Sequence, residues 1–221
     1  MSATPPPIRT DPSQILIDTG VVAVLRAPHA RDYAPVIEAL AEGGVRSIEL
    51  TLSTPGTFDE LPELRRRFDD AIEIGVGTVT SVVQAQTAID LGADYLVTPI
   101  TVADLIDVAV SGGVPIYPGG LTPTELFAGW ARGATAVKLF PASTVGPGYL
   151  GQLSGPFPDL EVVPSGGISI DDVDGWISAG ALAVSLGGPL LQDAFRGGSA
   201  RALEERARQV RGRVDAARSA R

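Results

Sequence analysis

Short apolar segments alternate with longer segments of helical spacing along most of the chain. Such short apolar runs are typical of parallel strands buried on both faces, which do not alternate apolar and polar side chains. Eight strands are predicted, over Val21–Arg26, Ser47–Leu52, Ile72–Val79, Tyr95–Thr98, Pro115–Tyr117, Ala136–Phe140, Glu161–Pro164 and Ala183–Leu186. Helices are predicted over Gln14–Asp18, Tyr33–Ala41, Pro55–Phe68, Ser81–Leu91, Val102–Ser111, Thr122–Arg132, from Ser169 onward, and over Ala200–Ala217.

Eight strands, each followed by a helical segment, predict an α/β protein with a (β/α)8 TIM barrel and a short N-terminal helix. A loop or irregular helix is expected between the sixth and seventh strands. A doubly wound open sheet is the alternative that the same pattern allows. The 221 residues suit one domain, expected over residues 11–221 after a flexible, proline-rich tail over residues 1–10.

Composition narrows the function classes. The net charge of −9 argues against nucleic-acid binding, and the absence of cysteine excludes disulfide and thiolate chemistry. No apolar run reaches the roughly 18 residues of a membrane span, and the N-terminus lacks an apolar signal core. His29 is the only histidine and the acidic residues are scattered, so no metal site is predicted. A cytoplasmic protein with a small-molecule partner, binding neither nucleic acid nor membrane, is expected.

Lys138 does not fit the apolar strand that contains it. Burial disfavours the charged ammonium, so this position favours a neutral, nucleophilic amine of the kind that a Schiff-base enzyme needs. Two structural alternatives remain open at this point. The side chain either reaches the end of the strand and solvent, or pairs with a carboxylate without taking part in chemistry.

Other unusual residues lie near the C-terminal ends of the predicted strands, where barrel enzymes carry their chemistry. Glu49, flanked by apolar residues, can shuttle a proton or simply pair with Lys138. Arg26 offers a planar fork to a carboxylate or phosphate, or is a solvated strand-end residue. Thr78 either holds a carboxylate or caps the following helix.

Two glycine pairs follow the seventh and eighth strands, in Ser165–Ile168 and Leu186–Gly188. Barrels often bind phosphate there, because glycine lets backbone N–H groups approach an anion and a following helix N-terminus adds its dipole. Glycine pairs also form plain tight turns. The predicted catalytic residues are Lys138 and Glu49, and the predicted substrate-binding residues are Arg26, Thr78, Thr98, Pro99, Ser165, Gly166, Gly167, Gly187 and Gly188.

From Val21 to about Leu191 the chain resembles the class I 2-keto-3-deoxy-6-phosphogluconate and 4-hydroxy-2-oxoglutarate aldolase family. The matching stretches are Gly43–Leu52, Gly75–Val79, Val97–Pro99, Ile116–Gly119, Val137–Ser143 and Pro164–Ile168. The resemblance implies a (β/α)8 barrel that assembles as a homotrimer and needs no metal or organic cofactor. It places Lys138 on the Schiff-base lysine, Glu49 on the general acid/base, and Arg26 and Thr78 on substrate-binding positions.

Three positions depart from the pattern of this family. Many phosphogluconate-type members have an arginine after Thr-Leu in the second strand, where this chain has Ser53. Galactonate-type relatives also lack that arginine and carry a first-strand arginine like Arg26. Ser165 replaces a common threonine. Pro189 stands where relatives often have serine, which removes a hydroxyl and a backbone donor from the expected phosphate site.

The expected function is that of a class I aldolase, a carbon–carbon lyase of carbohydrate metabolism of the Entner–Doudoroff type. It would cleave a 2-keto-3-deoxy(-6-phospho) sugar acid or 4-hydroxy-2-oxoglutarate to pyruvate plus glyceraldehyde 3-phosphate or glyoxylate. One alternative is a phosphate-binding barrel isomerase or epimerase. The other is a non-catalytic ligand-binding barrel, which the change at Pro189 keeps open.

Overall fold

The computed structural model describes residues 9–220, and the strands within this range are parallel to their neighbours in two sheets. The first sheet has the order β5-β4-β3-β2-β1-β9, with bounds Ile116–Tyr117, Leu96–Val97, Glu73–Gly77, Ser47–Thr51, Val21–Leu25 and Val184–Leu186. The second has the order β6-β7-β8, with bounds Gly119–Gly120, Val137–Leu139 and Val162–Pro164.

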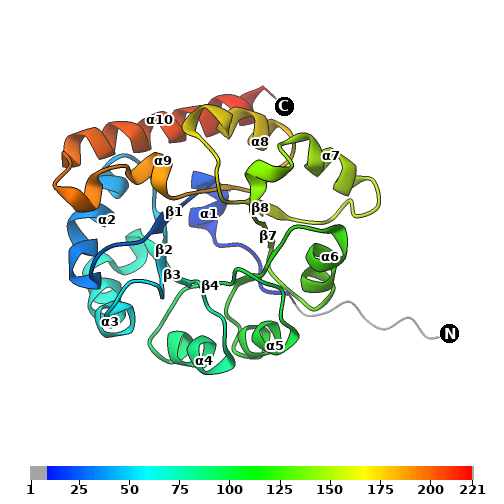
Figure 1. The fold of residues 1–221 in the computed structure, drawn as a ribbon, viewed down its shortest axis with the longest axis horizontal. Coiled ribbons are helices and arrows are strands. Elements are labelled where there is room, and N and C mark those ends of the chain that lie inside the picture. The colour runs from blue at the N-terminus through cyan, green and yellow to red at the C-terminus, as the bar shows by residue number, and fades with distance from the viewer. Residues whose placement is uncertain (1–8, 221) are drawn as a thin grey trace.

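The sheets curl around a common centre, with helices on the outside (Figure 1). The predicted α/β class and parallel strands are confirmed, but the hydrogen-bonded ladder is not one continuous ring of eight strands. Pro118 separates β5 from β6, because proline has no N–H to donate to a ladder. On the other side, one bridge between Ser165 and Ser185 connects the end of β8 to β9.

The helices alternate with the strands much as predicted. Their bounds are α1 Gln14–Thr19, α2 Tyr33–Glu42, α3 Thr57–Phe68, α4 Val82–Asp90, α5 Ala103–Ser111, α6 Pro123–Ala131, α7 Gly148–Ser154, α8 Val173–Ser178, α9 Gly188–Leu191 and α10 Ala200–Ser219. Local side-chain interactions explain where some helices begin, as at the N-terminus of α6. Thr122 and Glu125 form a reciprocal capping box there, with Pro123 at the first helical position.

Two apolar regions hold the fold together. Outside the strands, α10 packs against α2 and α8 through one apolar stripe that includes Leu203, Val210 and Val214. Inside them, Leu16 of α1 packs in a buried cluster with Tyr95 and other strand residues. The short N-terminal helix therefore lies at the centre of the fold in Figure 1, behind the strands.

Of the predicted flexible tail over residues 1–10, residues 1–8 lie outside the described part. Arg9 lies over the ring of Trp130, with its guanidinium carbon 3.3 Å from the ring centroid. The same side chain donates hydrogen bonds to the carbonyl oxygens of Trp130 and Ala134. These contacts anchor the start of the described chain to α6. No helix between residues 9 and 220 combines the length and the apolar character needed to cross a bilayer.

Candidate active site

Lys138 lies in the middle of β7, with Gly119 of β6 and Val163 of β8 as its register partners. Its side chain is buried, as predicted, and is only 10% exposed. The ammonium nitrogen lies 3.8 Å from Oε2 of Glu49 and 5.4 Å from the centroid of the Phe140 ring. Lys138 is also the only lysine in the sequence. The strand therefore holds the single side-chain amine of the protein beside one carboxylate.

Glu49 is 2% exposed and lies on β2, beside Gly75 of β3. Its carboxylate occupies space that a side chain on Gly77 would take, since a Cβ there would lie 1.9 Å from Oε1. The distance of 3.8 Å to Lys138 is within ion-pair range but longer than a hydrogen bond. Neither carboxylate oxygen accepts a hydrogen bond from a described residue. Both oxygens of Glu49 are therefore available for a hydrogen bond from a bound hydroxyl.

The Lys138–Glu49 pair opens into a cavity of about 250 Å³, which we call the inner cavity. Ten of the predicted site residues line it. They are Lys138, Glu49, Arg26, Thr78, Pro99, Ser165, Gly166, Gly167, Gly187 and Gly188. Thr98 lies outside this lining, because its hydroxyl donates to the carbonyl of Ile100 and accepts from the N–H of Gly119. The Thr98 side chain thus holds the loop after β4 in place.

The lining also includes residues that the sequence did not single out as binding residues. Phe140 and Ile168 form part of the apolar wall, and Pro189 faces the cavity beside the glycine pair of β9. Ser185 also lines it and pairs with Ser165 through a hydroxyl–hydroxyl hydrogen bond of 3.2 Å. A serine within the apolar segment Val184–Leu186 is the same kind of irregularity as Lys138, and this signal could have identified it.

Thr78 follows β3 and lines the inner cavity with an unusual backbone conformation. Its φ of 62° lies in the left-handed region, where a β-branched residue is a genuine outlier. The alternative that Thr78 caps the next helix is wrong, since the side chain that caps α4 belongs to Ser81. Strained backbone of this kind is concentrated at binding and catalytic sites. Thr78 is therefore a good candidate for contact with a ligand.

Arg26 lies just beyond β1 and is exposed. Its Nε donates a hydrogen bond of 2.8 Å to Oγ of Ser53, and no described carboxylate forms an ion pair with it. The hydroxyl of Ser53 therefore orients the guanidinium of Arg26. The two terminal nitrogens of Arg26 remain available to an anion.

The glycine pairs provide close backbone approach, and a helical segment follows each of them. Gly166 and Gly167 have φ values of 88° and 73°, which other residues rarely adopt. The first pair leads into η4 (Ile170–Asp172), which continues directly into α8, and the second pair leads into α9, which has four residues. A helical start therefore lies behind each pair, although α9 is only a single turn. Between residues 9 and 220, no three acidic or histidine side chains gather as metal ligands.

Comparison with known sequences identifies the family. The sequence model of a family described as KDPG and KHG aldolase matches residues 13–200. The chain belongs to this family. It is a class I aldolase and thus a carbon–carbon lyase. The predicted family is confirmed, and the isomerase and non-catalytic alternatives are set aside.

Individual relatives within the family differ in their named substrates. The chain is 31% identical over 201 residues to the 2-dehydro-3-deoxy-6-phosphogalactonate aldolase of Escherichia coli K12, covering 90% of this chain and 95% of that relative. It is 37% identical over 150 residues to the 2-dehydro-3-deoxy-phosphogluconate aldolase of Pseudoalteromonas atlantica, covering 67% and 69%.

A solved structure of the family bears on the chemistry. The Legionella pneumophila KDPG aldolase, with pyruvate captured at low pH as a covalent carbinolamine, superposes with a TM-score of 0.80. It is 27% identical to this chain, and the match covers 89% of this chain and 96% of that one. A carbinolamine is the adduct that precedes a Schiff base, so the Legionella enzyme has been observed on the covalent pathway.

Proposed function

We propose that this aldolase cleaves a 2-keto-3-deoxy-6-phospho sugar acid to pyruvate and glyceraldehyde 3-phosphate, with Lys138 and Glu49 as the catalytic residues. The observation that carries the proposal is the buried amine 3.8 Å from a buried carboxylate that forms no hydrogen bond, at the wall of one cavity. The names of the family relatives support the substrate class. Cleavage of 4-hydroxy-2-oxoglutarate to pyruvate and glyoxylate is the unphosphorylated alternative.

Lys138 attacks the C2 carbonyl carbon through its side-chain nitrogen and forms a carbinolamine, which loses water to give an iminium. Glu49 takes the proton of the 4-hydroxyl, and the C4–O bond becomes the carbonyl of the departing aldehyde. The electrons of the C3–C4 bond flow into the iminium and give an enamine. Protonation of C3 and addition of water then release pyruvate and restore the amine.

The remaining residues of the inner cavity orient the substrate. Thr78 presents its hydroxyl and its strained backbone to the carboxylate end, close to the β3 glycine under Glu49. Arg26 faces the cavity from the end of β1. The glycine pairs of β8 and β9 provide close backbone approach on the far side. Thr98 supports this arrangement through its loop and does not contact substrate.

The galactonate configuration at C4 is favoured over the gluconate one. The support is the Arg26–Ser53 hydrogen bond, because an arginine on the first strand without one after Thr-Leu is the galactonate-type pattern. The galactonate relative also matches over nearly its whole length. The measurement is kcat/KM for the two C4 epimers, and a preference for the gluconate epimer would contradict this assignment.

Trapping with borohydride tests the catalytic role of Lys138. Incubation with pyruvate and sodium borohydride should add one reduced pyruvyl group to the intact chain, and peptide mapping should place it on Lys138. Because the chain has no other lysine, the α-amino group is the only competing amine. An adduct confined to the N-terminus, or no adduct at all, would show that the mechanism is wrong. Borohydride without pyruvate is the control.

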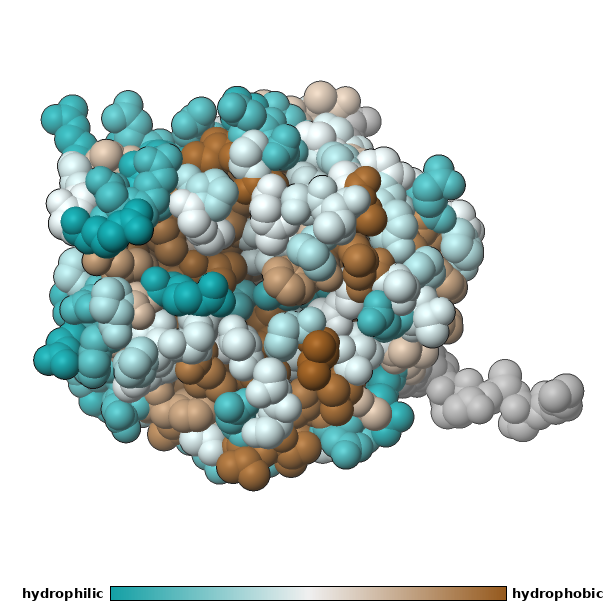
Figure 2. Space-filling view, viewed as in Figure 1, coloured by the Kyte–Doolittle hydropathy of each residue, from teal (hydrophilic) through white to brown (hydrophobic). Residues whose placement is uncertain are grey.

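We also propose that the two curled sheets form a closed (β/α)8 barrel, joined through Pro118 and through the Ser165–Ser185 bridge. We propose a homotrimer as well, on the basis of the family resemblance. Exposed apolar side chains support self-association, since Val83, Ile100 and Phe127 are 75%, 48% and 42% exposed. Figure 2 shows apolar surface over α4 and α5, at the lower edge of the view.

Light scattering tests the assembly. It should give about three times the chain mass of 22.8 kDa for the native protein and a smaller mass for Val83→Asp. A native mass of one chain would refute the trimer. The cytoplasmic location expected from the sequence stays a prediction.

A further inference from the structure

A second, larger cavity adjoins the inner one at the end of β1 and β9. It measures about 400 Å³, and we call it the outer cavity. Val24, Arg26, Gly187 and Gly188 line both cavities, so these four residues lie at the boundary between them. The outer cavity ends at Gln192 and Arg196, in the segment between α9 and α10. The described chain therefore offers space beyond the Lys138–Glu49 pair, on the side of Pro189.

The charges along the two cavities are unusual for an acidic protein. Glu49 is the only carboxylate of the joint lining, whereas Lys138, Arg26 and Arg196 are cations. The chain as a whole has a net charge of −9. Neither arginine forms an ion pair with a described residue, although seven other arginines do. A cationic cavity in an acidic protein concentrates anionic ligands at that point.

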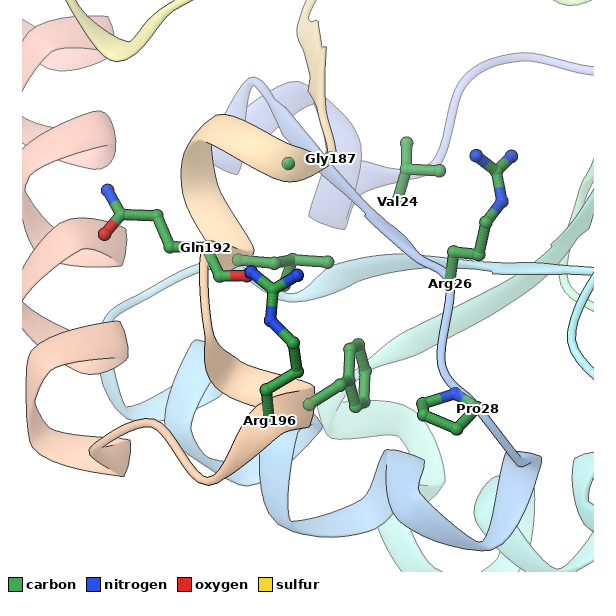
Figure 3. Close-up of a pocket in the computed structure, with 9 residues that line it drawn as sticks. Val24, Arg26, Pro28, Gly187, Gln192 and Arg196 are labelled. Atoms are coloured by element: carbon green, nitrogen blue, oxygen red, sulfur yellow. The ribbon is translucent and has the colours of Figure 1, made fainter.

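Arg196 is exposed, and its position suits an anion at the solvent side of the outer cavity. Figure 3 shows its guanidinium directed inward beneath α9, while Arg26 lies across the cavity with its guanidinium directed away from Arg196. One terminal nitrogen of Arg196 donates a hydrogen bond of 3.1 Å to the carbonyl of Gln192. The remaining N–H groups are available, and the planar fork of arginine matches the oxygens of a phosphate.

We propose that the outer cavity binds the terminal phosphate of the substrate, with Arg196 as the cation that recognises it. This inference rests on the proposed function for the nature of the substrate. A 6-phospho sugar acid is anionic at both ends, and the lining offers one unpaired arginine near the catalytic pair and a second one further out. Pro189 cannot donate from its backbone and α9 is a single turn, so a side-chain cation takes over their part.

Binding of sugar acids without a keto group tests the outer cavity independently of the covalent chemistry. 6-Phosphogluconate, gluconate and glucarate cannot form an imine and differ only in the group at the far end. In isothermal titration, Arg196→Gln should weaken the binding of 6-phosphogluconate about 10- to 100-fold, which is the effect of losing one hydrogen bond to a charged group. The same substitution should change the affinity for gluconate by less than about twofold, because the neutral far end of gluconate has no charge-assisted hydrogen bond to lose.

Arg46→Gln is the matched control. Arg46 is exposed, immediately precedes β2 at the end opposite to the cavities, and forms no ion pair with a described residue. The Arg46→Gln substitution removes the same charge as Arg196→Gln. It should leave the affinities for 6-phosphogluconate, gluconate and glucarate unchanged. Arg196→Lys should recover part of the loss, because it restores the charge without the planar fork.

The outcomes separate this inference from the proposed function. If Arg196→Gln leaves the preference for 6-phosphogluconate over gluconate unchanged, the phosphate is bound elsewhere and the inference is overturned. If Arg196→Gln weakens the binding of glucarate as much as that of 6-phosphogluconate, the cavity accepts any terminal anion and the assignment to phosphate is overturned. If binding of 6-phosphogluconate depends on Arg196 but pyruvate is not trapped on Lys138, the phosphate site in the outer cavity is supported and the proposed mechanism is refuted.

Discussion

Replacing Gly77 by alanine would place a methyl group where the carboxylate of Glu49 now lies. The added Cβ would meet Oε1 at 1.9 Å and the carboxyl carbon at 2.4 Å. An ordinary contact begins near 3.4 Å, so the oxygen must move by about 1.5 Å. The Cγ atom of Glu49 would also lie 2.5 Å away, but all three obstructing atoms belong to one flexible side chain, so we expect that side chain to shift and the fold to survive. Gly77 has no positive φ, so alanine meets no backbone strain there.

A displacement of about 1 Å of a catalytic group can cost about 100-fold in rate. Complete loss of a general acid–base group costs about 10² to 10⁴-fold. We therefore expect kcat for Gly77→Ala to fall by at least about 100-fold, without exceeding the loss of Glu49→Gln. The overpacking itself should cost about 1 to 3 kcal/mol, or roughly 2 to 12 °C in Tm for a chain of this size.

The assay is release of pyruvate coupled to lactate dehydrogenase, with borohydride trapping as a check that Lys138 still reacts. Gly212→Ala is the control, since a Cβ at that helical glycine meets no atom within 4 Å. The double variant Gly77→Ala with Glu49→Gln should be no slower than Glu49→Gln alone, if the methyl group acts only through Glu49. Retention of more than a third of the native kcat, or full additivity in the double variant, would refute the reasoning.

Three further predictions follow from the inner cavity and the core. Glu49→Gln should retain imine formation but lower kcat by about 10² to 10⁴-fold, and a loss below roughly tenfold would leave Glu49 a structural partner only. Pro189→Ser restores a hydroxyl and an N–H, so kcat/KM for the phosphorylated acid should rise by up to about tenfold, with no change for 4-hydroxy-2-oxoglutarate. Burial raises the pKa of Glu73, so its ionisation opposes folding as pH rises through that pKa. Calorimetry should therefore find that the Tm difference between Glu73→Gln and the native chain favours the variant more at pH 8 than at pH 4. Equal Tm differences at the two pH values would contradict this.

The sequence predicted the elements well where one physical signal dominated. Buried parallel strands read as short apolar runs, so Lys138 and Glu49 stood out as charges in the wrong place. Their convergence followed from the rule that barrel chemistry lies at the C-terminal strand ends. The structure places both on the wall of the inner cavity.

The remaining features depend on tertiary geometry that no local pattern encodes. The hydroxyl of Thr98 turns to its own loop, although its position at a strand end resembles that of Thr78. The turn α9 is four residues long and has no helical period to detect. Arg196 carried no local signal, because Val24, Arg26 and Pro28, which line the outer cavity with it, are about 170 residues away in sequence.

The single lysine has a consequence for the survival of the enzyme during turnover. Each cycle releases an aldehyde, and aldehydes condense with primary amines wherever they meet them. On this protein every cationic side chain other than Lys138 is a guanidinium, which stays protonated and is a poor partner for that reaction. The surface is thus resistant to glycation by the product of its own active site. Prolonged exposure to excess aldehyde is expected to inactivate the enzyme through Lys138, with the rest of its side chains left unmodified.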